Sequence, residues 1–249
     1  MANPTTVIVV PCYNEAKRLR KGLFIDFVKD YRDIQVLFVN DGSIDETQDV
    51  LRNICIEDPA RLSVLNLHQN VGKAEAVRQG FLQAFKRSPK FIAMWDADLS
   101  SPLTEVIGFQ TFLVDNEDFQ LVMGTRVKLL GRNIRRSTSR HILGRIAATL
   151  ISFALKLDVY DTQCGAKLFR TNEFTRVIFD HPFESSWIFD VELIARLIKS
   201  FSVIHPDYSD KLIYEFPLSE WCEMTGSKIR PSHYFKSLID LIRIKITYR

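Results

Sequence analysis

An apolar stretch that ends in two aspartates, Phe91 to Ser100, places the tightest constraint on this fold. Its first residues are continuously apolar rather than alternating, which predicts a strand buried on both faces of a parallel sheet. Asp96 and Asp98 then fall at the carboxyl end of this strand, where open α/β sheets bind their ligands. Two carboxylates this close repel each other, and Mg²⁺ or Mn²⁺ would relieve the repulsion because these ions prefer carboxylate oxygen. The competing interpretation is a turn in which an aspartate caps the next helix.

The composition is that of a globular protein. The chain has 249 residues, of which 46% are hydrophobic and 25% are charged, and its net charge is +3. Its four cysteines are far apart and form no C-x-x-C pair, so we expect reduced thiols, without a zinc site or disulfides. The first residues do not resemble a signal peptide, and no apolar run reaches about 18 residues, so we expect a cytoplasmic protein without a membrane-spanning helix.

Apolar runs alternate with amphipathic segments through the first 100 residues. We expect strands at 5–10, 34–39 and 62–67, and the fourth strand is the 91–100 stretch. Helices are expected at about 15–30 and at 71–85, and another is expected to begin after Ser43, which would be its N-cap. This alternation predicts a mostly parallel, Rossmann-like central sheet flanked by helices, within a single α/β domain.

Polar residues follow each of these four strands. They are Tyr13 and Glu15, Asp41, Asn70 and Lys73, and finally Asp96 and Asp98. The carboxyl ends of parallel strands share one crevice, so this set suits a nucleotide diphosphate, with Lys73 neutralising phosphate. Taken alone, Asp41 fits a plain turn and Lys73 a solvated helix start.

The pattern of charged residues changes in the second half of the chain. We expect a helix at 105–114 and a strand at 119–123, and no Asp or Glu occurs from Phe119 to Leu157. Basic residues gather in the first part of this stretch: Arg126, Lys128, Arg132, Arg135, Arg136, Arg140 and Arg145. An apolar helix expected at 142–157 follows, which is too short to span a bilayer but suits a membrane interface. A core helix beside a solvated arginine face is the alternative; a nucleic-acid site is disfavoured because aromatic residues are not interleaved.

The last third contains one helix start of interest. A loop at 159–166 should enter a strand, and a helix should run from Trp187 to about Ser200, with Asp190 near its start. Strands are expected at 202–205 and 212–216, a loop at 221–228, and an amphipathic basic helix at 234–248. This last helix is either docked on the domain or in contact with a membrane.

Four motifs in the first half resemble family 2 glycosyltransferases, which have a GT-A fold. They are Val9-Val10-Pro11-Cys12-Tyr13-Asn14-Glu15, Asn40-Asp41-Gly42-Ser43-Ile44-Asp45, Asn70-Val71-Gly72-Lys73 and Asp96-Ala97-Asp98. The resemblance implies a nucleotide-sugar site formed by Pro11, Tyr13, Glu15, Asp41, Asn70, Lys73, Asp96 and Ala97, with Asp96 and Asp98 as metal ligands. Asn40 stands where the family usually has Asp, and Ser100 is a weaker metal ligand than the Gln of some members.

Three later motifs resemble dolichyl-phosphate β-glucosyltransferases and their prokaryotic polyprenyl-phosphate relatives. These are Asp161-Thr-Gln-Cys-Gly-Ala-Lys-Leu-Phe, Trp187-x-Phe-Asp-Val-Glu-Leu and Trp221-x-Glu-x-x-Gly-Ser-Lys. The relatives usually have Phe at the position of Ala166, so a pocket is expected to be larger here. The eukaryotic relatives carry an N-terminal anchor that this sequence lacks, which predicts a protein peripheral on the cytoplasmic face of the membrane.

The resemblance implies transfer of a hexose, with inversion, from a nucleotide-diphosphate sugar to a polyprenyl phosphate; UDP-glucose is the first expectation. Residues 1–100 would form the donor half, 101–230 the acceptor half and 231–249 a C-terminal helix. Asp98 and Arg126 would take part in catalysis, and the acceptor would meet Arg126, Arg136, Arg140, Asp161 and Gln163.

Two alternatives stay open. A phosphate acceptor needs no strong base, but a saccharide hydroxyl does, and Asp190 is then the candidate general base. A non-catalytic protein that binds nucleotide or anionic membrane is the third hypothesis.

Overall fold

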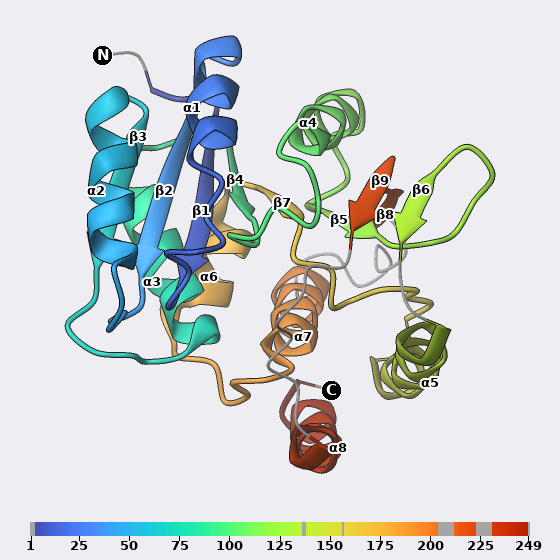
Figure 1. The fold of residues 1–249 in the computed structure, drawn as a ribbon. Helices are drawn as coiled ribbons and strands as arrows, with labels where there is room; N and C mark the ends of the chain where they lie inside the picture. Colours follow the sequence, from blue (N-terminus) through green and yellow to red (C-terminus); the bar gives the residue numbers. More distant parts are fainter. Residues whose placement is uncertain (1–2, 136–137, 156, 204–211, 223–230, 249) are drawn as a thin grey trace.

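A seven-stranded sheet forms the centre of the computed structural model, which describes residues 3–135, 138–155, 157–203, 212–222 and 231–248 (Figure 1). The strands lie in the order β3-β2-β1-β4-β7-β5-β8. Their bounds are β1 Thr6–Cys12, β2 Ile34–Asn40, β3 Leu62–Asn66, β4 Phe91–Met94, β5 Leu121–Thr125, β7 Lys167–Arg170 and β8 Ile213–Pro217. Within this sheet β7 runs antiparallel to both neighbours, while the other pairs are parallel. A second, two-stranded sheet pairs β6, Asn133–Arg135, with β9, Glu220–Cys222.

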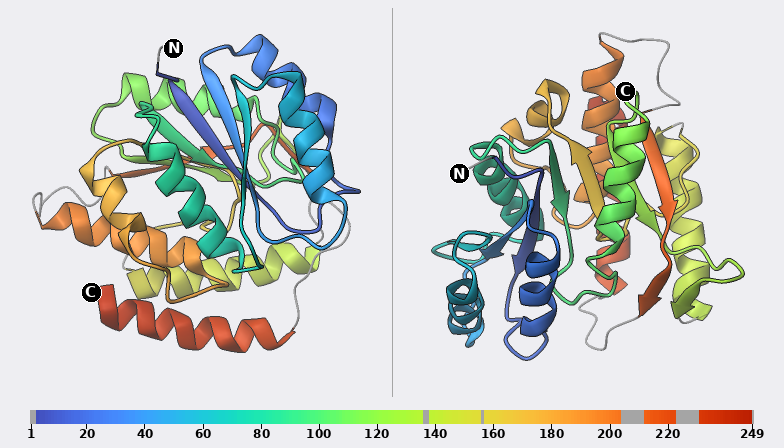
Figure 2. Two further views of the ribbon diagram at one scale, coloured as in Figure 1. Left: turned by 90° about the vertical axis from the view of Figure 1, so that its left-hand side faces the viewer. Right: turned by 90° about the horizontal axis from the view of Figure 1, so that it is seen from above.

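Helices cover both faces of the large sheet. One face packs against α1 Lys21–Asp30, α2 Thr47–Glu57 and α4 Glu105–Asp115. The other packs against α3 Lys73–Phe85, α6 Glu173–Asp180 and α7 Phe189–Ser202. The last two helices, α5 Thr138–Leu155 and α8 Pro231–Tyr248, share a third apolar cluster with α7. Figure 2 shows these three helices gathered at one end of the molecule.

The continuously apolar strands explain why the sheet is covered twice. Along β1, Val7 and Val9 face the α3 side, whereas Ile8 and Val10 face the α1 side, and all four are fully buried. Helix α3 approaches the sheet closely because Gly80 lies over β1, where an added Cβ would overlap the Val9 side chain.

The expected α/β class and the mostly parallel sheet are confirmed. Most expected elements lie within a few residues of their predicted places. Three were not expected: α6, β6 and β9. Trp221 and Cys222 lie in β9 rather than in a loop, and 223–228 lie outside the described residues. The strand expected at 202–205 is wrong at its start, since α7 continues to Ser202 and residues 204–205 fall outside the described part.

Two expected helix starts are also wrong. The first helix begins at Lys21 rather than near Glu15, because the segment from Asn14 to Ala16 bonds to the β2–α2 loop instead. Ser43 does not cap α2, which begins at Thr47. The Ser43 hydroxyl accepts instead from the backbone N–H of Asn14 at 3.1 Å, so it joins two loops.

Candidate active site

A short loop after β4 carries the paired aspartates. Its shape is fixed by Trp95, which is buried and donates from Nε1 to the carbonyl oxygen of Ser101 at 2.8 Å. Leu99 has a φ of +51°, an uncommon conformation for a non-glycine residue, which sustains the tight turn. Asp98 Oδ1 accepts from the backbone N–H and the hydroxyl of Ser100 at 3.0 and 2.8 Å. The loop is therefore ordered by its own contacts.

Each aspartate faces a different cation. Lys73 Nζ lies 2.6 Å from Asp96 Oδ1, and Arg18 Nη2 lies 2.8 Å from Asp98 Oδ2. Arg18 also contacts Glu15, and Arg20 donates to the carbonyl oxygen of Asp98 at 2.9 Å. Lys73 stands at the start of α3, directly after Gly72, whose φ is +91°. Three loops therefore meet at this edge of the sheet: the β1–α1 loop, the β3–α3 loop and the loop after β4. The sequence predicted such a meeting of strand ends.

The charges also link the two halves of the chain. Partial burial by itself would raise the pKa of Asp96, but the ammonium of Lys73, followed by Lys167 and Arg126, holds the pKa below its usual value. Conversely, the pKa of Lys73 is raised: burial opposes its charge, but Asp96 and then Asp190 outweigh that effect. Asp96 therefore lies among cations from both halves.

Gly165 allows this close approach. A Cβ added at this position would overlap the carboxylate of Asp96. The 159–166 loop therefore passes directly beside Asp96. The glycine of the Asp-Thr-Gln-Cys-Gly motif allows this approach because it has no side chain.

Asp41 organises a neighbouring loop. It is buried, and its oxygens accept from Asn70 Nδ2 at 2.9 Å and from the backbone N–H groups of Val71 and Gly72 at 2.8 and 3.0 Å. Asn40, which departs from the family pattern, donates to Asn66 and accepts from the N–H of Ser43. An amide serves here better than a carboxylate because it donates and accepts at once.

Arg126 is held by Asp161 in a bidentate pair. Its Nε and Nη2 each lie 2.6 Å from an oxygen of Asp161, and the side chains are 14% and 7% exposed. The guanidinium also lies over the ring of Trp221 at 5.3 Å. Burial opposes the charge, but Asp161 outweighs it and raises the pKa of Arg126 above its ordinary value.

Glu215 fixes the loop that carries Asp161. Its carboxylate accepts from the backbone N–H groups of Tyr160 and Asp161 at 2.8 and 2.7 Å. Arg145 of α5 donates to the carbonyl oxygen of Tyr160 and stacks on its ring at 3.9 Å. Burial is the main cause that raises the pKa of Glu215.

Asp190 forms a buried ion pair. Lys167 Nζ lies 2.5 Å from Asp190 Oδ1 and donates to the carbonyl oxygen of Cys164 at 2.6 Å. Lys167 has no exposed surface, and Asp190 is almost completely buried. Asp190, the candidate general base, is therefore held in a buried ion pair with a lysine of β7.

The remaining predicted residues differ in how much of their environment the structure describes. Pro11, at the end of β1, and Tyr13, in the loop that follows, are partly buried, Ala97 is buried and Gln163 is exposed. Arg136 and the side chain of Arg140 lie outside the described part of the chain. Ala166 is a fully buried member of the core.

Sequence reasoning missed Arg18, Arg20, Lys167 and Glu215. Arg18 lies three residues beyond the motif that ends at Glu15, and Lys167 lies within the Asp161 motif, so only their proximity to the motifs gave a signal. Glu215 lies in an ordinary strand and gave none.

The donor chemistry of the paired aspartates fits a divalent cation. Within the described residues no group of three or more His, Cys, Asp or Glu could hold a metal ion. Mg²⁺ sites, however, commonly use one or two carboxylates and complete their shell with substrate phosphates and water. Asp96 and Asp98 supply such oxygens and are 38% and 20% exposed, which leaves them accessible.

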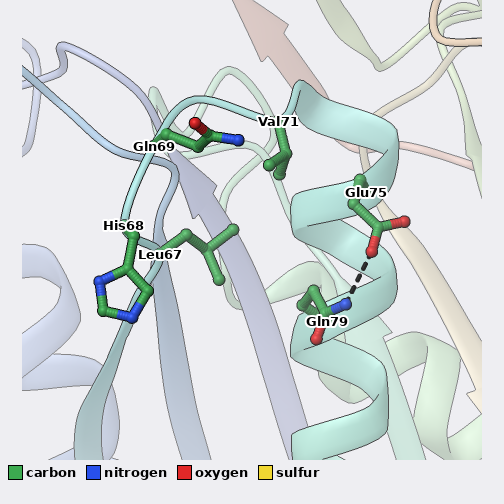
Figure 3. A pocket seen from close by; sticks show the side chains of 6 residues that line it. All are labelled: Leu67, His68, Gln69, Val71, Glu75 and Gln79. Atoms are coloured by element: carbon green, nitrogen blue, oxygen red, sulfur yellow. Dashed lines mark hydrogen bonds between the residues drawn. The ribbon is translucent and has the colours of Figure 1, made fainter.

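A separate hollow lies beside α3, as Figure 3 shows. It has a volume of about 260 Å³ and is lined by Leu67, His68, Gln69, Val71, Glu75 and Gln79. Gln79 Nε2 donates to Glu75 at 2.7 Å within it. None of the predicted site residues lines this hollow, so it lies outside the candidate site.

Known sequences resemble this chain along nearly its full length. A family model described as glycosyl transferase family 2 matches residues 7–176. A dolichyl-phosphate β-glucosyltransferase of Trichomonas vaginalis is 31% identical over 98% of this chain and 72% of its own length. The enzymes of the same name from Saccharomyces cerevisiae and Homo sapiens are each 30% identical over 97% of this chain and cover 74% and 75% of their lengths.

Solved structures resemble the fold at lower identity. Glucosyl-3-phosphoglycerate synthase from Mycobacterium tuberculosis, in complex with Mn²⁺, UDP-glucose and phosphoglyceric acid, gives a TM-score of 0.67 at 17% identity, covering 97% of this chain and 80% of that one. A mannosyltransferase from Pyrobaculum calidifontis with GDP-mannose and Mn²⁺ gives 0.62 at 15% identity. This chain covers 64% of that second protein, and 98% of this chain is matched. The expected GT-A type of fold is confirmed.

Proposed function

This chain belongs to glycosyl transferase family 2, and from that premise we propose that it transfers glucose from UDP-glucose to a polyprenyl phosphate at a membrane surface. The observation that carries the proposal is the contact between Lys73 and Asp96, which are 2.6 Å apart at a site where Lys167 and Arg126 also lower the pKa of Asp96. A site that joins two phosphate-bearing substrates needs such cations, because their negative charges would otherwise repel each other.

The donor is proposed to lie over the ends of β1, β2 and β4. Pro11, Tyr13, Glu15 and Asp41 would surround the nucleoside, and Asn70, Lys73 and Ala97 would line the path to the diphosphate. Lys73 is well suited to bind a phosphate oxygen, since its ammonium is partly exposed and already oriented by Asp96.

Mg²⁺ or Mn²⁺ is the proposed cofactor, held by Asp96 and Asp98. When bound, it would neutralise charge that builds on the leaving diphosphate. Arg18 and Ser100 orient Asp98 for this purpose.

Arg126 is proposed to bind the acceptor phosphate. Asp161 engages Nε and Nη2, so the remaining edge of the guanidinium is oriented before the acceptor arrives. Asp161 is then a positioning residue, because a carboxylate in direct contact with phosphate would repel it. Gln163, Arg136 and Arg140 complete the proposed acceptor side.

The environment of Asp190 favours the phosphate acceptor over a saccharide hydroxyl. A general base must come within hydrogen-bond reach of the proton it removes. Asp190 is buried, and its Oδ1 already accepts from Lys167. A phosphomonoester has a second pKa of about 6 and supplies its own oxyanion at neutral pH, so its attack depends mainly on orientation.

An apolar surface on α5 and α8 supports membrane contact. Ile146, Leu150 and Phe153 share one face of α5, and Phe153 is 77% exposed. Leu238, Ile239, Ile242 and Ile246 form a matching stripe on α8, with Ile246 76% exposed. Lys245 lies over the Phe153 ring at 4.7 Å, so the two stripes adjoin. Among the described residues no helix is both long and apolar enough to cross a bilayer.

The choice of UDP-glucose rests on the relatives. The similar curated enzymes are named for glucose and dolichyl phosphate, and one structural neighbour holds UDP-glucose. Another neighbour holds GDP-mannose, so GDP-mannose is the competing donor in the test of this choice.

The decisive experiment incubates the protein with a panel of labelled nucleotide sugars and Mg²⁺ or Mn²⁺, with and without undecaprenyl phosphate in detergent. We expect a lipid-soluble glucosyl product from UDP-glucose that requires the lipid phosphate. Donor hydrolysis that ignores the lipid would refute the proposed acceptor and favour a hydroxyl acceptor with Asp190 as base.

Arg126→Ala tests the acceptor side within the same assay. We expect a raised KM for the lipid phosphate and an unchanged KM for the donor. Arg52→Ala, an equal change of charge at an exposed position of α2, is the matched control. A raised donor KM with an unchanged acceptor KM would contradict the assigned role.

A further inference from the structure

Helix α8 is joined to the start of α7 through buried polar groups that the proposed reaction does not use. Ser185, in the loop before α7, donates from its hydroxyl to Asp240 Oδ2 of α8 at 2.8 Å. The same hydroxyl accepts from the backbone N–H of Ile188 at 3.1 Å. Ile188 immediately precedes α7, and its carbonyl oxygen accepts from Val191 and Glu192, which begins the helix.

A second carboxylate holds the same loop from within α7. Glu192 accepts from the backbone N–H groups of Glu184 and Ser185 at 3.2 and 3.0 Å. It is fully buried and paired with Arg196 at 2.6 Å, and it also contacts the hydroxyl of Tyr248 at the end of α8. Residues of α8 therefore touch this loop system at two points.

The first turn of α7 contributes directly to the candidate site. Phe189 lies under the ammonium of Lys73, with 6.0 Å between Nζ and the ring centre. Asp190, the next residue, pairs with Lys167. A shift of this turn would move a neighbour of the lysine that orients Asp96, as well as the partner of Lys167.

The buried carboxylate of Asp240 is difficult to explain by packing alone. Asp240 is 4% exposed, and Arg243, an exposed cation of the same helix, lies 3.9 Å from it. Its neighbours Leu241 and Ile244 already dock α8 through apolar contacts. Burying a carboxylate is unfavourable, and an apolar residue would dock the helix at lower cost. What Asp240 adds is a directed bond to Ser185.

We propose that Asp240 and Ser185 are positioning residues, through which the C-terminal helix fixes the first turn of α7 and so completes the active site. The inference rests on the proposed function only in so far as the transfer reaction is one of the two readouts that test it. In Figure 1, α7 lies between α8 and the sheet, which is the arrangement such a connection requires.

Ser185→Ala, Asp240→Ala and the double variant test the connection. We expect each single variant to lower kcat by about 10-fold to 100-fold, as a misplacement near 1 Å does elsewhere, with both KM values little changed. The double variant should be no slower than either single one, because the two changes break one bond. Ser185→Thr keeps the hydroxyl and should restore most of the activity.

Lys199→Met is the matched control. Lys199 Nζ donates to the carbonyl oxygen of Thr247 at 2.8 Å, so this change removes a contact between the same two helices away from the start of α7. We expect it to leave kcat unchanged. Equal losses of kcat in Lys199→Met and Ser185→Ala would overturn the proposal, since any loosening of α8 would then suffice.

Amide hydrogen exchange supplies a readout that needs no substrate. The N–H groups of Val191 and Glu192 donate to Ile188, and they should exchange faster in Ser185→Ala but not in Lys199→Met. Unchanged exchange in Ser185→Ala would refute the positioning role. The wild type could also transfer no sugar to lipid phosphate while these N–H groups still exchange faster in Ser185→Ala. That pair of results would retain the positioning role and refute the proposed function instead.

Discussion

At the scale of single residues, the absent side chain of Gly165 determines where the Asp96 carboxylate lies. Gly165→Ala would place a Cβ within that carboxylate, which must move away from Lys73. We expect the Kd for UDP with Mn²⁺ to rise by about tenfold or more, because a hydrogen bond to a charged group contributes about 1.5–3 kcal/mol. Calorimetric titration of the folded variant measures this change.

Gly22→Ala provides the control for that substitution. An added Cβ on α1 meets only an ordinary contact with Asp26, and alanine in a helix is favoured over glycine by about 0.5–1 kcal/mol. We expect unchanged nucleotide affinity and a slightly higher free energy of unfolding. If Gly165→Ala binds the nucleotide as tightly as Gly22→Ala, the position of the Asp96 carboxylate is irrelevant to donor binding.

Asp161 is a second residue at which one substitution should affect both stability and acceptor binding. Asp161→Asn leaves the largely buried guanidinium of Arg126 without its charged partner, and breaking a buried pair costs up to about 3–5 kcal/mol. We expect a lower free energy of unfolding in urea and a higher KM for the lipid phosphate. The same change at Asp49, whose pair with Arg52 is exposed, should cost at most about 1 kcal/mol. Equal losses at the two positions would argue against a special role for the buried pair.

At the scale of elements, two loops at the strand ends are joined by hydroxyl groups. Thr47, the first residue of α2, accepts from the backbone N–H of Glu15 at 2.8 Å and donates to Asp45 at 2.5 Å. Its side chain is buried. The β1–α1 and β2–α2 loops, both predicted to contact the nucleoside, therefore form one unit.

Thr47→Val tests this unit with a side chain of nearly the same shape. Loss of the bond that the N–H of Glu15 donates to the hydroxyl should lower the free energy of unfolding by about 1–3 kcal/mol and weaken nucleotide binding as well. Urea denaturation and calorimetric titration measure the two effects. Thr111→Val, on the exposed face of α4 where the hydroxyl bonds back to Ile107, should change neither. If Thr47→Val is destabilised but binds nucleotide normally, the bonds between the two loops do not contribute to the donor site.

The elements also show why sequence reasoning succeeded in part. The strands β1, β2 and β4 are mostly apolar and almost fully buried, and polar loops follow them, so their period and ends could be predicted. The antiparallel direction of β7 could not, because a four-residue strand with a fully buried lysine gives no clear pattern. Ion pairs such as Arg18 with Asp98, 80 residues apart, depend on tertiary structure that no local pattern encodes.

At the scale of the whole molecule, catalytic and membrane-facing surfaces are predicted to be carried by connected helices. The inner faces of α5 and α8 share an apolar cluster with α7, while their outer faces expose isoleucine, leucine and phenylalanine beside Arg243 and Lys245. Exposed apolar groups with basic neighbours suit a bilayer that contains anionic lipids. The hydrogen bond between Ser185 and Asp240 would then link lipid contact to the order of the active site.

The double variant Ile242→Ser, Ile246→Ser tests the membrane contact. We expect the wild-type protein to float with phosphatidylglycerol vesicles, and less so as salt screens the basic residues. Full burial of an isoleucine side chain contributes about 1.5–3 kcal/mol, so the variant should partition at least about tenfold more weakly. Because both side chains are exposed, its free energy of unfolding should change by less than about 0.5 kcal/mol per site.

Ile56→Ser with Val114→Ser is the matched control, since both side chains are as exposed but lie on α2 and α4. This control should float like the wild type, because the change in surface polarity is the same while the α5–α8 surface is intact. If both double variants lose flotation equally, the binding is a general property of the apolar surface. If neither loses it, the lipid contact lies elsewhere, and α8 would act on α7 without any link to the membrane.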